Sequence, residues 1–386
     1  MKFLFLVTDF DAGGITSSLR NLTSLLCDKE HEVHILNLAK ADTLPEDFDK
    51  RIKLVGLDKR AILWNLSKED LKGSRGIRKI KLFILGFIKK LMNRGEGWMN
   101  FAFKNLSFEG YDAVIGFRQS PVCFYLASRK NKGGKKIGFW HVDLDYAGDI
   151  SGWDYLISEL DAIGCVSNAV TEAMACRYSS SEEKFLTVYN VFDDEKIMDL
   201  ASRENPYDEK EFNIVTVSRI EFEQKQLNFI PEVCNRLRNQ GYRIKWHIIG
   251  DGPHMPNLKE LIRKFEVEDS VVLHGAKTNP FPFFKYANLF ALTSLWETYG
   301  MVVVESLICN TPVVACEYPA LKEILDNGVN GIVAENSADG MYEALVRVLA
   351  DREFYERLKT GAMAYKYSPE IAYNQFMEMV KCDAEI

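Results

Sequence analysis

Short apolar runs alternate with segments of helical periodicity along almost the whole chain, and this alternation constrains the fold more than any other feature. Strand-like runs in the first half occupy residues 3–8, 32–38, 113–116, 136–140 and 162–166. A second series occupies residues 213–218, 245–249, 271–273, 289–293 and 312–315. Apolar strands that alternate with helices are typical of parallel sheets covered by helices on both faces. The sequence therefore predicts an α/β protein with two doubly wound, Rossmann-like halves.

The chain has 386 residues, which is more than one hydrophobic core usually supports, so two domains are expected. A polar segment with Pro206, residues 201–211, reads as a linker between them. In the first half, Gly13 and Gly14 form a tight loop after the first strand, and a helix over 16–26 follows that Thr16 or Ser17 could cap. The closing residues 369–380 have an apolar pattern suited to a helix.

Composition narrows the class of protein. With 47% hydrophobic and 27% charged residues the chain is expected to be globular, and its net charge of −7 argues against nucleic acid as a partner. The eight cysteines include no C-x-x-C pair, so neither a zinc site nor a disulfide framework is indicated, and a reducing cytoplasm is expected. The apolar first residues resemble a signal segment, but Asp9 and Asp11 follow closely and favour a buried strand. No run approaches the ~18 apolar residues of a membrane span.

Two carboxylates lie eight positions apart around a turn in the second half. Glu297 follows the strand at 289–293, Gly300 marks the turn, and Met301 begins a helix that carries Glu305. Ligands of open α/β sheets bind at the carboxyl edge, beside helix N-termini whose free amides favour phosphate. The pair could therefore bind two hydroxyl-bearing parts of one ligand, although the spacing alone also fits solvated charges on a helix face.

Other candidate site residues follow strands as well. Arg219 ends the strand at 213–218 and Lys225 lies six residues on, so the two cations suit a diphosphate, with a surface salt bridge as the alternative. Gly250 opens a Gly-Asp-Gly-Pro turn that lacks the third glycine and the acidic residue of a dinucleotide fingerprint. Glycines 13 and 14 permit close backbone approach to a ligand, and His141 follows the strand at 136–140.

The ordered string of motifs from Trp296 to Val333 resembles the C-terminal half of retaining GT-B-fold glycosyltransferases of family 4, also called group 1. The resemblance covers most of the chain and is strongest over residues 213–335. It implies two Rossmann-like domains facing a central cleft, with residues 1–195 binding the acceptor and 196–368 binding a nucleotide sugar. Residues 369–386 would form a helix that crosses back to the first domain.

The resemblance also implies roles for single residues. Glu305 would hold the ribose hydroxyls, and Glu297 and His141 would orient the donor sugar. Arg219 and Lys225 would neutralise the leaving diphosphate. Other donor contacts would come from the Gly13–Gly14 loop, from the turn at Gly250 and from the backbone amides of Thr298, Tyr299, Gly300, Met301 and Val302. The chain departs from the family pattern at Ser218, at Gln226 and at residues 319–320, where the family usually has glycine.

The reaction implied by the resemblance moves a hexose or N-acetylhexosamine from a nucleotide-diphosphate sugar to a glycan or lipid-linked saccharide during surface polysaccharide or capsule synthesis. UDP is expected as the carrier because it is the commonest in related enzymes. The anomeric configuration is retained, and neither a metal nor a cofactor is expected. Alternatives are a non-catalytic glycosyltransferase-like subunit, a phosphorylase or a GT-B nucleotide-sugar epimerase. Asp143 and Asp145 form an Asp-x-Asp pair typical of a metal site in the other main, single-domain architecture, which lacks a counterpart of the second domain.

The chain has one basic stretch, residues 72–104, in which Glu96 is the single acid. An apolar stripe at helical spacing runs between its basic residues. Such a helix can lie on an anionic membrane surface, or its stripe can pack on the domain core. A lipid-linked acceptor would reconcile both, and the protein is expected in the cytoplasm or at the inner face of the cell membrane.

Overall fold

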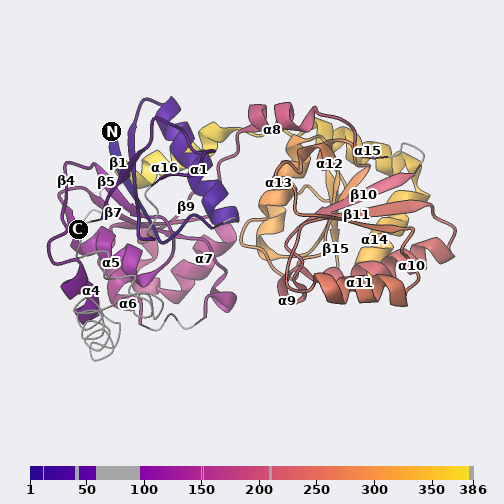
Figure 1. Cartoon of the computed structure of the whole chain (residues 1–386), viewed down its shortest axis with the longest axis horizontal. Coiled ribbons are helices and arrows are strands. Elements are labelled where there is room, and N and C mark those ends of the chain that lie inside the picture. Colours follow the sequence, from indigo (N-terminus) through magenta and orange to yellow (C-terminus); the bar gives the residue numbers. More distant parts are fainter. Residues whose placement is uncertain are drawn as a thin grey trace, which may run out of the picture. The chain divides into compact units, whose positions relative to one another are not determined.

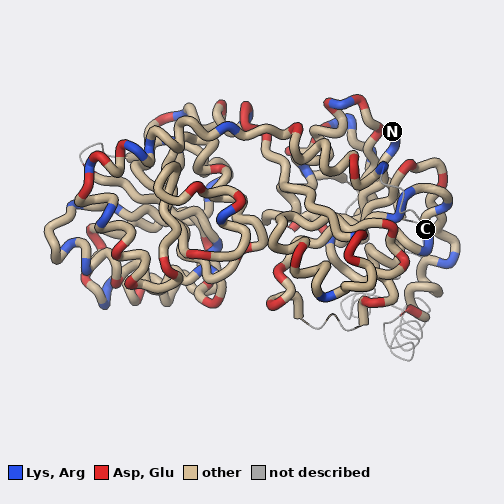
Figure 2. The backbone as a smooth tube through the Cα atoms, turned by 180° about the vertical axis from the view of Figure 1, so that it is seen from behind, with Lys and Arg blue, Asp and Glu red and all other residues tan. Residues whose placement is uncertain are grey.

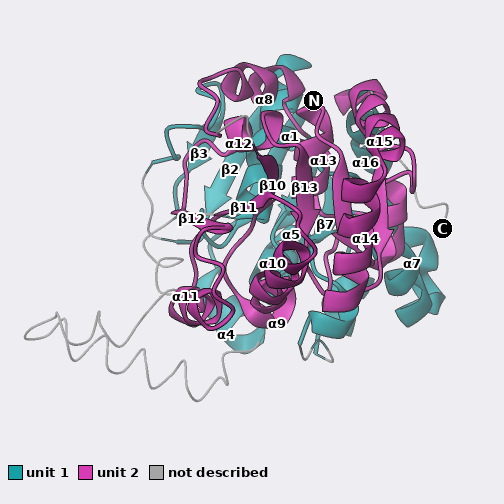
Figure 3. Cartoon of the chain, turned by 90° about the vertical axis from the view of Figure 1, so that its right-hand side faces the viewer, with its two compact units in different colours: residues 1–166, 170–191, 370–386 teal, residues 167–169, 192–369 magenta. Residues whose placement is uncertain are grey.

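The computed structural model describes residues 1–11, 13–39, 43–57, 96–148, 150, 152–207 and 211–381. The chain forms two compact units, coloured separately in Figure 3. Unit 1 contains residues 1–166, 170–191 and 370–386, and unit 2 contains residues 167–169 and 192–369. Each unit is built around one parallel sheet with helices on both faces (Figure 1).

Within the described residues the sheet of unit 1 has seven strands, and every neighbouring pair is parallel. Their spatial order is β3 (Lys53–Val55), β2 (Glu32–Asn37), β1 (Lys2–Val7), β5 (Ala113–Gly116), β7 (Lys135–Trp140), β8 (Ala162–Cys165) and β9 (Phe185–Thr187). A separate parallel pair joins β4 (Phe108–Glu109) to β6 (Asn131–Lys132). The chain turns from one side of the sheet to the other between β1 and β5, so this is its switch point.

Successive side chains of each strand point to opposite faces, and this divides the core of unit 1 into two layers. One layer packs Phe3 and Phe5 of β1 against α1 (Gly14–Asp28) and α16 (Pro369–Lys381). The other layer packs Leu4 and Leu6 against helices α4 (Glu96–Ala102), α5 (Pro121–Arg129), α6 (Asp154–Ser158) and α7 (Asn168–Arg177). Strands buried on both faces explain the nearly continuous apolar runs in the sequence.

The start of α1 differs from the sequence-based expectation. The helix begins at Gly14 and its N-cap is Gly13, which makes no side-chain cap hydrogen bond. Thr16 lies inside the first turn, where its hydroxyl donates to the Asp11 carbonyl at 2.6 Å. The prediction that Thr16 or Ser17 caps this helix is therefore wrong.

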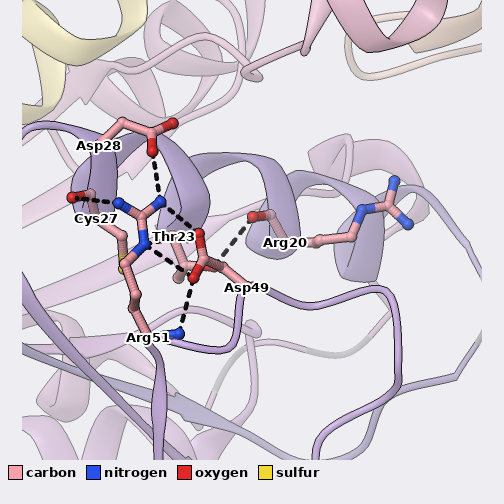
Figure 4. A network of polar contacts seen from close by, with 6 residues as sticks. All are labelled: Arg20, Thr23, Cys27, Asp28, Asp49 and Arg51. Carbon is pink, nitrogen blue, oxygen red and sulfur yellow. Dashed lines mark hydrogen bonds and ion pairs between the residues drawn. The ribbon is translucent and has the colours of Figure 1, made fainter.

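The other end of α1 is held by an arginine (Figure 4). The Arg51 guanidinium donates to the Cys27 carbonyl at 3.1 Å and forms ion pairs with Asp28 and Asp49. A cation there complements the partial negative charge at the C-terminus of a helix. The hydrogen bonds from Arg51 are the largest cause of the lowered pKa of Asp49. The network ties the segment that leads into β3 to the end of α1.

The sheet of unit 2 has six parallel strands. Their order is β12 (Val271–Gly275), β11 (Ile244–Ile249), β10 (Phe212–Val217), β13 (Leu289–Leu292), β14 (Val313–Cys316) and β15 (Gly331–Ala334). Its helices are α8 (Asp194–Ala201), α9 (Phe222–Lys225), α10 (Ile230–Asn239), α11 (Met255–Lys264), α12 (Phe281–Lys285), α13 (Met301–Ile308), α14 (Ala338–Ala350) and α15 (Arg352–Ala364). The switch point lies between β10 and β13.

The predicted α/β class with two doubly wound sheets is confirmed, and every predicted strand is present within about two residues of its expected ends. The short strands β3, β4, β6, β9 and β15 were not predicted. Of the basic stretch 72–104 the structure describes only residues 96–104, where α4 buries Trp98, Met99 and Ala102. Its proposed membrane face lies outside the described residues.

Basic and acidic residues are interspersed over both units (Figure 2). None of the helices in the described ranges is long and apolar enough to cross a membrane.

The packing of α16 in unit 1 can be tested at Phe376, which is fully buried and whose ring lies 5.4 Å from that of Phe3 and 6.5 Å from that of Phe139. We expect Phe376→Ala to lower the free energy of unfolding by about 3–5 kcal/mol, because it leaves a cavity beside β1. Chemical denaturation monitored by circular dichroism measures this. Ile371→Ala changes an exposed residue of the same helix and should stay within about 0.5 kcal/mol of the wild type. Equal effects of the two substitutions would contradict the packing.

Candidate functional site

The candidate residues of unit 2 lie in loops at the carboxyl edge of its sheet. Arg219 and Lys225 follow β10, whereas Glu297 and Gly300 follow β13, so the two groups flank the switch point. Glu305 lies in α13, which starts from the same edge. This edge is where open α/β sheets bind their ligands. The structure thus brings together residues that are more than 70 positions apart in the sequence.

An ion pair joins the two loops. Lys225 Nζ lies 2.6 Å from Glu297 Oε1, and the Ser294 hydroxyl donates to the same oxygen at 2.8 Å. The Lys225 and Glu297 side chains are only 17% and 13% exposed. Limited access of water strengthens the Coulomb attraction within such a pair and makes either charge costly to leave without its partner.

Main-chain contacts fix the same two loops to each other. The Thr293 hydroxyl donates to the Lys225 carbonyl at 2.6 Å, and the Leu295 amide donates to the Gln224 carbonyl at 2.7 Å. The Gln224 side-chain amide donates to the Trp296 carbonyl at 3.2 Å. The position of Lys225 relative to Glu297 is therefore set by the backbone and not only by the ion pair.

Gln226, directly after Lys225, adopts the left-handed conformation with φ 47° and ψ 33°. This conformation is costly for a residue with a Cβ atom and explains why glycine is usual here in the resembled family. The side-chain oxygen of Gln226 is buried without a hydrogen-bond partner in the described part of the chain. The loop keeps a glycine-like backbone even though glycine is absent.

Gly300 is the N-cap of α13 and has φ 87° and ψ 54°. A Cβ atom at this position would lie 2.0 Å from the Tyr318 hydroxyl oxygen, which itself donates to the Tyr299 carbonyl at 3.3 Å. Residues 298 and 299 lead into this turn, and Met301 and Val302 form the first turn of α13. The first amides of a helix lack intrahelical acceptors, so this turn offers donors to an anion.

Arg219 is exposed, and its position depends on the turn after β11. The Ile220 amide donates to the Asp251 carbonyl at 2.9 Å. Gly250 has φ 149°, and a Cβ atom there would lie 1.8 Å from the Ser218 carbonyl oxygen. The role that the structure gives to Gly250 is thus close packing against the loop that carries Arg219. Within the described residues Arg219 forms no ion pair, in contrast to Lys225.

His141, in unit 1, is buried at the end of β7. Its Nε2–H donates to the Phe117 carbonyl at 2.8 Å, and its main-chain amide donates to Gln119 Oε1 at 2.9 Å. Burial lowers the pKa of His141 to about 4, the Phe117 hydrogen bond opposes this shift, and the charge of Arg118 adds to it. At neutral pH the ring is therefore neutral, with Nδ1 as the acceptor. Gly13 and Gly14 lie in the same unit at the start of α1.

Sequence reasoning missed a second ion pair, between Asp9 after β1 and Arg118 after β5. The Thr8 hydroxyl donates to Asp9 at 2.7 Å. Partial burial opposes a lowered pKa of Asp9, but hydrogen bonds from Thr8 and Asp11 and the charge of Arg118 lower it. The two residues flank the switch point of unit 1, and the signal for them was a charged residue two positions past the end of each of two strands.

One group in the described ranges has the spacing of a metal site. Ligand atoms of Glu221, Glu223 and His254 lie within 4.8 Å of one another. The Glu221 carboxylate already caps α9, and His254 Nδ1 already accepts the Phe222 amide at 3.1 Å, so a cation would compete with these bonds. In the Asp-x-Asp segment, Asp143 Oδ1 accepts the Asp145 amide at 3.0 Å and caps a short 3-10 helix.

The match to a known protein family lies in unit 2. Residues 198–364 match the profile of the family described as "Glycosyl transferases group 1". The alpha-D-kanosaminyltransferase of Streptomyces kanamyceticus is 30% identical over 168 residues, which are 42% of this chain and 43% of that protein. An N-acetylgalactosaminyltransferase of Campylobacter jejuni, whose full name specifies a diphospho-undecaprenol-linked acceptor, is 26% identical over 54% of this chain and 58% of its own length. The chain thus spans about half the length of these curated relatives.

Similarity to solved structures extends over the whole chain. Staphylococcus aureus TarM, solved as a mutant with UDP, has a TM-score of 0.73 and 16% identity and covers 99% of this chain and 100% of its own. Anabaena HepE with UDP has a TM-score of 0.69 and 17% identity, with 98% and 99% covered. The two Rossmann-like units have the GT-B fold.

The strain at Gln226 predicts a gain in stability. Gln226→Gly should raise the free energy of unfolding by about 0.5–1 kcal/mol, because glycine adopts the left-handed conformation without steric cost. Gln226→Ala removes the unpartnered oxygen but keeps the strain, so it should gain less. Thermal and urea denaturation measure both. An alanine variant as stable as the glycine variant would show that backbone strain is not the cause.

The buried His141 predicts acid sensitivity of unit 1. Its folded pKa of about 4 lies below the ordinary value of 6.5, so between these values the unfolded chain binds a proton that the folded chain does not. The free energy of unfolding should therefore fall as the pH drops from 6.5 to 4, by up to ~1.4 kcal/mol per pH unit for one histidine. His141→Gln should flatten this dependence in urea titrations at several pH values. Gln119→Ala, which keeps the titrating ring, should preserve the slope.

Proposed function

We propose that this protein is a retaining glycosyltransferase of family 4 that uses a nucleotide-diphosphate sugar. The observation that carries the proposal is the convergence of Arg219, Lys225, Glu297 and the N-terminus of α13 at the switch point of unit 2. The group 1 glycosyltransferase match over residues 198–364 covers this same edge. The proposed reaction moves a hexose or N-acetylhexosamine to a glycan or lipid-linked saccharide in the synthesis of a capsule or other surface polysaccharide.

The residues divide the donor between them. Arg219 and Lys225 carry the two positive charges that a diphosphate requires, and the amides that open α13 add uncharged donors. Glu305 is the fifth residue of α13, just over one helical turn from its start, and accepts hydrogen bonds from the ribose hydroxyls. Glu297 accepts hydrogen bonds from hydroxyls of the sugar. In unit 1, the neutral ring of His141 offers Nδ1 as a further acceptor for a sugar hydroxyl. The backbone of the Gly13–Gly14 loop carries no side chains, so a phosphate of the ligand can approach it closely.

The chemistry that we propose retains the anomeric configuration. The bond between the anomeric carbon and the diphosphate breaks while the acceptor oxygen forms its bond on the same face of the sugar. The acceptor proton passes to the departing diphosphate, whose growing charge is stabilised by Arg219 and Lys225. Preorganised charges of this kind often account for most of the lowering of an activation barrier. Because the two cations supply this stabilisation, the proposed mechanism includes neither a metal nor a cofactor.

UDP is the proposed carrier, supported by two similar structures that are described as UDP complexes. A lipid-linked acceptor is supported by the Campylobacter jejuni relative, whose name specifies a diphospho-undecaprenol glycan. Such an acceptor would place the protein in the cytoplasm or at the inner face of the cell membrane. A non-catalytic subunit or an epimerase would share the fold, but neither explains why all four charged residues, Arg219, Lys225, Glu297 and Glu305, are present.

A thermal-shift panel with UDP, GDP, ADP and CMP tests the donor site. We expect UDP alone to raise the melting temperature, since saturation at 100 times the dissociation constant adds ~2.7 kcal/mol of stability. Arg219→Ala and Glu305→Ala should abolish the shift. Arg236→Ala, which removes a surface cation paired with Asp339, should keep it.

Product analysis completes this test. Incubation with UDP-sugars and saccharide acceptors should release UDP. Nuclear magnetic resonance should then show that an α-linked donor gives an α-linked product. If the protein is folded and none of the nucleotides changes its melting temperature, the result would support a non-catalytic subunit instead. Conversion of the sugar nucleotide in the absence of an acceptor would support the epimerase.

A further inference from the structure

We infer that the Lys225–Glu297 ion pair makes the donor site discriminate against free nucleoside diphosphate in favour of the intact sugar nucleotide. The inference rests on the proposed function, because it assigns the site to a sugar nucleotide. It adds that the two residues act as counter-ions to each other before the ligand arrives. The pair then sets a cost of binding that only a ligand carrying a sugar can offset.

The starting point is that the two cations of the site differ in availability. Arg219 is exposed and forms no ion pair in the described part of the chain, so its guanidinium can meet a phosphate directly. Lys225 is 2.6 Å from Glu297 and only 17% exposed. A diphosphate that recruits the Lys225 ammonium must therefore compete with a carboxylate already in place.

The surrounding backbone does not relieve this competition. Three hydrogen bonds, from Thr293, Leu295 and the Gln224 side chain, join the loop of Lys225 to the loop of Glu297. The two loops are therefore held together, and the Lys225 side chain makes the adjustment to a ligand. When the ammonium turns toward a phosphate, Glu297 stays where Ser294 holds it.

The free diphosphate and the sugar nucleotide differ in the hydrogen-bond donors that they offer to Glu297. A free diphosphate draws away Lys225 and leaves a carboxylate that is 13% exposed, with the Ser294 hydroxyl as its remaining donor among the contacts of the described residues. It also brings its own negative charge close to that carboxylate, and an uncompensated, mostly buried charge is costly. A sugar nucleotide instead presents hydroxyl groups that donate to Glu297. The pair therefore weakens the binding of the diphosphate product more than that of the donor, which favours product release.

Isothermal titration calorimetry with UDP, without acceptor, tests the inference on the wild type and on Glu297→Gln. The amide keeps the shape of the side chain and removes the competing charge. We expect Glu297→Gln to bind UDP about three- to tenfold more tightly, which is the range for a partly buried ion pair that no longer has to be broken. Glu223→Gln removes an equal charge from α9 without touching Lys225 and should leave the UDP affinity unchanged.

A second titration uses UDP-glucose, UDP-galactose and UDP-N-acetylglucosamine. For the sugar nucleotide that the wild type binds most tightly, Glu297→Gln should reduce the ratio of its affinity to that of UDP. Melting temperatures without ligand establish that each variant is folded. Glu297→Asp, which keeps the charge but shortens its reach to Lys225, provides a second variant and should bind UDP more tightly than the wild type.

The outcomes separate the inference from the proposed function. If the wild type binds UDP and Glu297→Gln binds it equally well or more weakly, the inference is overturned and the donor site stands. An equal gain for UDP and for the sugar nucleotide overturns it as well, because discrimination would be unchanged. Binding by Glu297→Gln but not by the wild type supports it in its strongest form. UDP binding by none of these folded proteins overturns both proposals.

Discussion

The adjacency of β10 and β13 is the constraint on which the candidate site depends. These strands pair in parallel through Ile214 and Val215, yet the chain leaves them in opposite directions across the sheet. Because crossovers between parallel strands are right-handed, α10 and α13 must pack on opposite faces. The loops that leave the two strands therefore separate, and the space between them cannot be filled by either helix. Charged side chains can approach one another there without entering the core.

The same logic organises unit 1 by itself. Its switch point lies between β1 and β5, and Asp9 and Arg118 form an ion pair there. Each unit thus places an ion pair at the point where its strand order reverses. The buried parts of the strands are mostly apolar, so this edge is where partly buried charges can be both paired and close to solvent. The fold thus places a partly buried ion pair at the switch point of each of its two sheets.

The sequence allowed the strands, the start of α13 and the edge that carries the charged residues to be predicted, because periodicity and turn glycines are local signals. The Lys225–Glu297 pair could not be predicted as a contact, since it depends on the order of strands and joins residues that are 72 positions apart. The capping of α1 was predicted wrongly, because a glycine N-cap leaves no side-chain signal. Gly250 was predicted to lie beside the ligand, whereas its packing against Ser218 appears only in three dimensions.

The position of α16 has a consequence for how the protein forms during synthesis. Phe376 completes the core layer over β1, but the ribosome makes residues 192–369 before it reaches that helix. At about 5–20 residues per second, unit 1 waits roughly 10–35 s for its last element while unit 2 emerges. During that interval the faces of Phe3, Phe5 and Phe139 that α16 later covers remain open. Unit 2 is nearly contiguous in the chain and can therefore fold first. Unit 1, although synthesised earlier, is the half that needs protection by chaperones for longer.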